Sequence, residues 1–162
     1  MPEWDAIHKY LILFVFLCSW VGTGLANAAD PAPGECPQRR NTAKAPADYL
    51  SRTNPLPASP EVLAAAERSY TGKSKSVPCL FCHGAKGDGK GYLASQYVPR
   101  PRNFTCKEIM SDLPDGQLFW IIQNGSPDTA MPPQTGSSMP AYRNLTDEEI
   151  WQLVRYIRNF AR

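Results

Sequence analysis

Residues 78–83 read PCLFCH, a segment in which two cysteines stand two residues apart and a histidine directly follows the second. Three kinds of chemistry use such a pattern. They are a tetrahedral zinc site, a redox-active disulfide, and the covalent attachment of a haem. The rest of the chain discriminates among these three interpretations.

The zinc and redox-disulfide interpretations lack the partners that they need. A structural zinc site normally gathers four ligands as two close pairs, whereas this sequence offers one close pair of cysteines. A thioredoxin-like CxxC stands at a helix start beside a βαβ unit, and the sequence shows no βαβ pattern. Both interpretations are therefore weaker than the third.

Haem attachment accounts for every part of the motif. Each cysteine sulfur can add to a vinyl group, and the adjacent histidine then reaches the iron from the same face of the macrocycle. We therefore predict one covalent haem c, bound through Cys79 and Cys82, with His83 as the proximal iron ligand.

The sixth ligand of the iron must be a methionine, another side chain, or nothing. After residue 28 the chain contains no histidine other than His83, which excludes a second imidazole from the mature protein. Met110 lies in CKEIMSDL, where we expect it to pack in the core. Met131 and Met139 each precede a proline within a long loop, and both remain candidates from the residues alone.

The N-terminal segment has the form of a secretory signal. An apolar run over residues 10–22 is followed by the small-x-small sequence Ala26-Asn27-Ala28. We predict that residues 1–28 are a signal peptide cleaved after Ala28 and that the protein is periplasmic or otherwise exported. The alternative is an uncleaved membrane anchor over residues 10–29.

Export also bears on the remaining cysteines. Outside the cytoplasm, spare thiols tend to pair, and haem attachment requires neither Cys36 nor Cys106. We predict a disulfide between them, which would tie the N-terminal part of the mature chain to the haem domain. Two unpaired thiols are the alternative.

Patterns of proline and apolar residues predict the architecture. Residues 29–58 contain six prolines without apolar periodicity, so we expect an irregular lead segment. Residues 59–162 show no strand-like alternation, which predicts an all-α domain with long loops around the haem. Its helices are expected to begin at Pro60, near residue 92, near residue 115 and after Thr146, where Glu149 completes a capping box.

The segment CLFCHGAKGDGKG, together with DGQLFWIIQNG and MPAYRNLTDEEIWQLVRYIRNF, resembles the class I c-type cytochromes, specifically the bacterial single-haem domains. The resemblance covers about residues 60–160 and implies a small helical fold with His/Met iron ligation. In that family a short loop separates the methionine ligand from the last helix. Met139 stands seven residues before Thr146 and is our predicted ligand. Met131 is the runner-up, because its spacing from Asn124 resembles that in other relatives.

The resemblance implies further roles. A proline carbonyl accepts the hydrogen bond of the proximal imidazole in this family, which suggests Pro101, with Pro99 as runner-up. Trp120 matches an aromatic residue that approaches a haem propionate, with core packing as the alternative. Ala66 and Tyr156 match the small and aromatic residues where the first and last helices cross.

A haem with both axial positions filled suits electron transfer better than catalysis. No acid–base pair or activated nucleophile appears elsewhere, so we predict an electron carrier and not an enzyme. Residues 73–107 carry seven Lys or Arg against one Asp, and residues 108–149 carry seven acidic residues against one Arg. The positive half could steer the protein to an acidic redox partner. The small net charge of +2 does not favour nucleic-acid binding.

Two other functions remain open at the level of sequence. The chain could be the haem-bearing subunit of a larger periplasmic or membrane-associated oxidoreductase complex, with the lead segment as its docking strap. A weak sixth ligand would instead make it a haem-based sensor or peroxidase.

Overall fold

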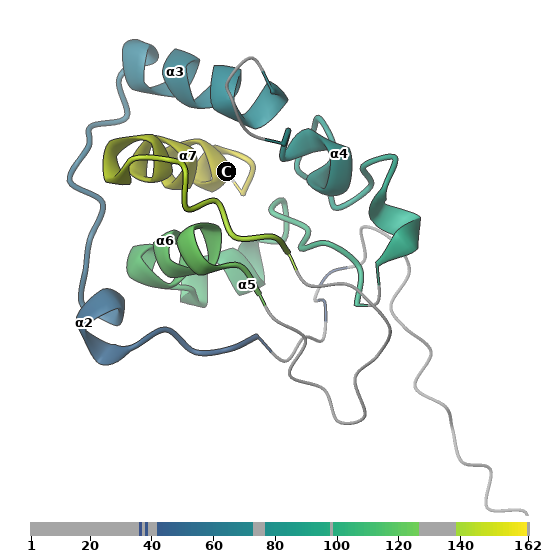
Figure 1. Cartoon of the computed structure of the whole chain (residues 1–162), viewed down its shortest axis with the longest axis horizontal. Coiled ribbons are helices and arrows are strands. Elements are labelled where there is room, and N and C mark those ends of the chain that lie inside the picture. Colours follow the sequence, from purple (N-terminus) through teal and green to yellow (C-terminus); the bar gives the residue numbers. More distant parts are fainter. Residues whose placement is uncertain are drawn as a thin grey trace, which may run out of the picture.

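The computed structural model describes residues 36, 38, 42–72, 77–97, 99–126 and 139–161. Within these residues the fold is helical and contains no strand, which confirms the all-α prediction (Figure 1). The helices are α2 (Ala47–Leu50), α3 (Pro60–Thr71), α4 (Leu80–His83), the 3₁₀ helix η1 (Ala94–Gln96), α5 (Lys107–Asp112), α6 (Asp115–Asn124) and α7 (Asp147–Asn159). The predicted signal segment and Met131 lie outside the described residues.

Helices α3 and α7 pack against each other and make more contacts than any other pair of described helices (Figure 1). Ala66 is fully buried on α3, so this helix presents a small residue where a bulky one would hold its neighbour away. The rings of Tyr70 and Tyr156 meet across the pair at a centroid distance of 5.3 Å. The buried residues of α7 are Ile150, Leu153, Val154 and Ile157, the apolar face that the sequence predicts.

Local signals in the sequence fix where these two helices begin. The Ser59 hydroxyl accepts from the Val62 N–H at 3.3 Å, and Pro60 occupies the first helical position, where its missing N–H costs nothing. At α7, Thr146 accepts from the Glu149 N–H at 3.2 Å while the Glu149 carboxylate accepts from the Thr146 N–H at 2.7 Å. This is the capping box predicted from the sequence.

Arg158, in the last turn of α7, joins that helix to the junction between α5 and α6. Its guanidinium forms an ion pair with Asp115 at 2.7 Å and also donates to the backbone carbonyls of Met110 and Leu113. The side chains of Arg158 and Asp115 are both mostly buried. The arginine therefore satisfies carbonyls where α5 ends and holds the start of α6 against α7.

The described part of the lead segment runs along the domain and forms one short helix, α2, where the sequence predicts only irregular chain (Figure 1). Two N–H groups, of Tyr49 and Leu50, bond to the Pro46 carbonyl, and α2 packs on α6. This tertiary contact stabilises a turn too short to stand alone. Gln117 of α6 also donates to the Ala43 carbonyl at 3.1 Å and accepts from the Ala45 N–H at 2.8 Å.

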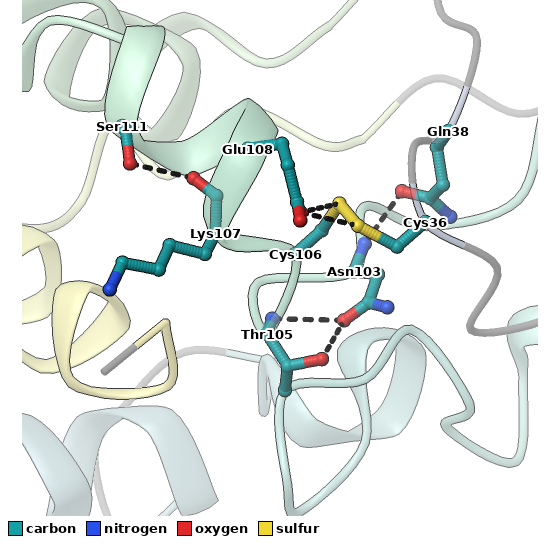
Figure 2. The surroundings of a disulfide bond; sticks show 8 residues. All are labelled: Cys36, Gln38, Asn103, Thr105, Cys106, Lys107, Glu108 and Ser111. Carbon is teal, nitrogen blue, oxygen red and sulfur yellow. Dashed lines mark hydrogen bonds between the residues drawn. A yellow bond between two sulfur atoms is a disulfide. The ribbon is translucent and has the colours of Figure 1, made fainter.

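A disulfide joins Cys36, in the lead segment, to Cys106, just before α5 (Figure 2). The two Cα atoms are 5.5 Å apart, a separation that a disulfide spans without moving the backbone. The carboxylate of Glu108 lies 3.0 Å from Cys36 Sγ and 3.5 Å from Cys106 Sγ. The lead segment is thus attached to the domain at both ends of the described stretch.

A substitution at Gly116 of α6 tests how closely α2 packs on α6. A Cβ at this position would collide with the carbonyl oxygen of Tyr49. Alanine is the better helix former by about 0.5–1 kcal/mol, but the overlap costs about 1–3 kcal/mol. We therefore expect Gly116→Ala to lower the free energy of unfolding by about 1 kcal/mol in guanidinium denaturation. A gain in stability would show that α2 does not dock this closely.

Candidate haem site

The motif CLFCH forms one helical turn that presents three reactive side chains to one cavity. The His83 N–H bonds to the Cys79 carbonyl at 2.9 Å, which closes the single turn of α4. Residues at positions i, i+3 and i+4 of a helix share one face. Accordingly Cys79, Cys82 and His83 all line the same cavity.

The cavity is large and mostly apolar. It holds about 1060 Å³ of space between protein atoms, a volume that includes space open to solvent. Burial raises the pKa of the Cys79 thiol to about 12, and it also raises the pKa of Tyr142. In both groups the main cause is burial, which disfavours the charged form. The aliphatic part of the wall comes mainly from α6 and α7, through Leu118, Ile121, Ile122, Leu153 and Ile157.

His83 Nδ1 lies 3.0 Å from the backbone carbonyl of Arg102. With Nδ1 as the donor to this oxygen, Nε2 is the nitrogen that an iron ion would take. The prediction that Pro101 supplies the carbonyl is wrong by one residue. The Pro101 carbonyl instead accepts from the Gln38 side chain at 3.2 Å. Pro99 and Pro101 both line the cavity.

The His83 ring is also held by an aromatic neighbour. Phe104 stacks on it with a centroid distance of 4.3 Å and an interplanar angle of 17°. The Phe104 N–H bonds to the Gly87 carbonyl at 2.6 Å, which ties this neighbour to the loop that follows α4. The imidazole is therefore restrained both at Nδ1 and across its face.

Met139 lines the cavity from the segment between α6 and α7. Its backbone is fixed to the end of α6, because the Ser126 N–H bonds to the Met139 carbonyl at 3.0 Å. Met110 is 1% exposed and belongs to the hydrophobic core, as predicted. Met131 lies outside the described residues.

Trp120 is not among the residues that line the cavity. The α6 residues that do so are Gln117, Leu118, Ile121 and Ile122. At 100° per residue these four share one face of the helix and Trp120 falls to its side. Trp120 is half-buried, and its approach to a haem propionate stays a prediction, with core packing as the alternative.

Arg102 is a cavity residue that the sequence analysis missed. Among the described residues that line the cavity, it has the permanent positive charge. Burial lowers its pKa, and its guanidinium donates to the hydroxyl of Thr42 in the lead segment at 3.1 Å. A basic residue within PRPRNF was visible in the sequence, but its contact with a residue 60 positions away was not.

The donor set fits a haem c. Two thiols, an imidazole and a thioether line one apolar cavity, and one partly buried cation is available for carboxylates. Such a helical fold and site define a c-type cytochrome domain.

In the part of the chain that the structure describes, no helix has the length and apolar character needed to cross a membrane.

Comparison with known families agrees with this class. Residues 73–157, more than half of the chain, match the family described as "Cytochrome C oxidase, cbb3-type, subunit III". The chain belongs to this family, whose c-type cytochrome domains bind haem c covalently and carry electrons. A comparison with curated proteins found no match.

Tyr70 supports the chain directly after His83. Its hydroxyl donates to the Gly84 carbonyl at 2.7 Å, and the side chain is fully buried. Losing this buried hydrogen bond should lower the free energy of unfolding of Tyr70→Phe by about 1–2 kcal/mol. Tyr92 is 68% exposed, so Tyr92→Phe is the matched control and should stay within about 0.5 kcal/mol of the wild type. Equal effects of the two changes in guanidinium denaturation would contradict this role.

Proposed function

We propose that this protein is an exported electron-transfer protein that carries one haem c, attached through Cys79 and Cys82. His83 and Met139 are the proposed axial ligands of the iron. One observation carries the proposal: both thiols, the imidazole and the thioether line a single apolar cavity. When bound, haem c supplies a one-electron Fe(III)/Fe(II) couple whose potential its surroundings adjust.

The side chains around the cavity favour electron transfer over substrate chemistry. The aliphatic walls exclude water, and a neutral methionine ligand favours the reduced state. The Arg102 carbonyl keeps the His83 ring in one tautomer and one orientation. A filled sixth position leaves no site for a substrate or gas, which weighs against the sensor and peroxidase alternatives.

Arg102 and Thr42 are the proposed partners of the haem carboxylates. A guanidinium is suited to a carboxylate because it offers several donors in one plane. The partly buried position of Arg102 and its contact with Thr42 would hold that charge inside the cavity. The lead segment, through Thr42, is then part of the haem pocket.

The proposal also includes export of the protein and cleavage of its signal peptide. Cleavage after Ala28 would leave a mature chain with a lead segment, residues 29–58, and a cytochrome domain, residues 59–162. The Cys36–Cys106 disulfide would form in the oxidising compartment. Its geometry in the structure, with Cα atoms 5.5 Å apart, supports this pairing.

A second candidate function is that of a subunit in an oxidase complex. The family to which the chain belongs is described as subunit III of a cytochrome oxidase, and this match favours assembly with other chains over a free shuttle. In either case the excess of Lys and Arg over residues 73–107 would favour an acidic docking face on the redox partner. Co-purification with other haem or copper proteins from the native membrane would distinguish the two candidates.

The central test is the state of the purified, exported protein. We expect its mass to exceed that of the polypeptide beginning at Ala29 by one haem, and the reduced spectrum of the denatured protein to retain the haem bands. Replacing Cys79 and Cys82 together by Ser should abolish the attachment. A colourless wild-type protein with the bare polypeptide mass would overturn the proposed function.

The two methionines of the long loop give a second test. Met139→Ala should remove the Met-to-iron charge-transfer band and lower the reduction potential, because a neutral thioether favours Fe(II). Met131→Ala is the matched control, with the same change eight residues earlier, and should keep the band. Loss of the band only in Met131→Ala would transfer the ligand role to Met131.

A further inference from the structure

The Gln38 side chain clamps the loop whose carbonyl faces the proximal histidine. Its amide nitrogen donates to the Pro101 carbonyl at 3.2 Å, and its amide oxygen accepts from the Asn103 N–H at 2.7 Å. Between these two bonded residues stands Arg102, whose carbonyl lies 3.0 Å from His83 Nδ1. Gln38 is 8% exposed, so water does not readily replace either bond.

This pairing constrains the direction of the carbonyl between the two bonds. A primary amide offers one donor edge and one acceptor edge in a single plane, and here it engages a carbonyl and an N–H two residues apart. Because each peptide unit is planar, fixing both ends of this short stretch limits the rotation of the Arg102 carbonyl. The hydrogen bond to His83 Nδ1 therefore depends on a side chain outside the loop.

Two further contacts hold Gln38 in place. Cys36, two residues earlier, is joined to Cys106, three residues beyond Asn103 (Figure 2). On the other side, the hydroxyl of Thr42 accepts from the Arg102 guanidinium at 3.1 Å. The disulfide lowers the entropy cost of placing this stretch of the lead segment against the loop.

We propose that Gln38 is a positioning residue for the proximal ligand. By fixing the Arg102 carbonyl, it sets the strength of the hydrogen bond from His83 Nδ1 and hence the basicity of the imidazole. A more basic imidazole favours the oxidised iron, so the clamp lowers the reduction potential relative to an unclamped loop. This inference rests on the proposed function, since it requires His83 to bind the iron of a haem.

The test uses the full-length, exported holoprotein with Gln38 replaced by Leu. The leucine keeps the approximate size of the side chain and removes both hydrogen bonds. We expect a positive shift in midpoint potential. We also expect the His83 Nδ1 proton to exchange with solvent roughly tenfold faster in NMR of the reduced, ¹⁵N-histidine-labelled protein, the ratio that corresponds to one lost hydrogen bond.

Asn54 provides the matched control. It is also an amide of the lead segment, and its Nδ2 donates to the Trp151 carbonyl at 2.8 Å, on α7 and outside the loop at 101–103. Asn54→Leu should lower the stability of the protein and leave both the potential and the exchange rate unchanged. If Gln38→Leu keeps wild-type values, or if Asn54→Leu shifts both readouts equally, the positioning role of Gln38 is wrong.

If the Gln38→Leu protein does not accumulate, a second variant still tests the proposal. In Gln38→Glu a protonated carboxyl retains one donor and one acceptor, whereas the ionised form loses the donor. Relative to the wild type at each pH, the exchange of the Nδ1 proton should be normal below the pKa of this carboxyl and faster above it. A constant ratio across that titration would overturn the inference. Absence of haem from the wild type would instead overturn the proposed function, so the two failures are distinguishable.

Discussion

The hydrogen bond between His83 Nδ1 and the Arg102 carbonyl forms only if several separate parts of the chain are correctly placed. One side of the bond requires the helical turn that begins at Cys79, because this turn brings the imidazole and both thiols to the same cavity. The other side requires an irregular loop to present one particular carbonyl. An irregular loop has no repeating hydrogen-bond pattern to fix its peptide planes, so side chains must do so. Gln38 performs this task, which places part of the site's geometry outside the helical domain.

The lead segment is for this reason more than a tail. It contributes a hydroxyl to the cavity through Thr42, a clamp through Gln38, and a covalent attachment through Cys36. The helices α3 and α7 provide the rigid core against which these parts act. A haem c bound in the cavity would be supported by residues drawn from both parts of the chain.

The cavity is mostly apolar and few charged side chains line it, which is consistent with the function that we propose. Among the described residues that line the cavity, Arg102 supplies the permanent positive charge, and burial makes its interaction with a carboxylate stronger than at the surface. The same low polarity raises the pKa of Cys79 and Tyr142. Protein surroundings of this kind adjust a reduction potential through hydrogen bonds, charge and exclusion of water. Adjustment of the reduction potential would matter in an oxidase subunit, the family that the chain matches.

The sequence by itself determined the features that depend on neighbours along the chain. The CLFCH spacing, the capping box at Thr146 and the apolar face of α7 are local patterns, and each predicts its structure through helical geometry alone. Tertiary structure decided which residues meet across long separations. It turned the Arg102 carbonyl rather than that of Pro101 toward His83 and folded α2 from a proline-rich segment. These outcomes depend on contacts some 60 to 75 positions apart, such as those of Gln38 and Gln117, and no local pattern encodes such a contact.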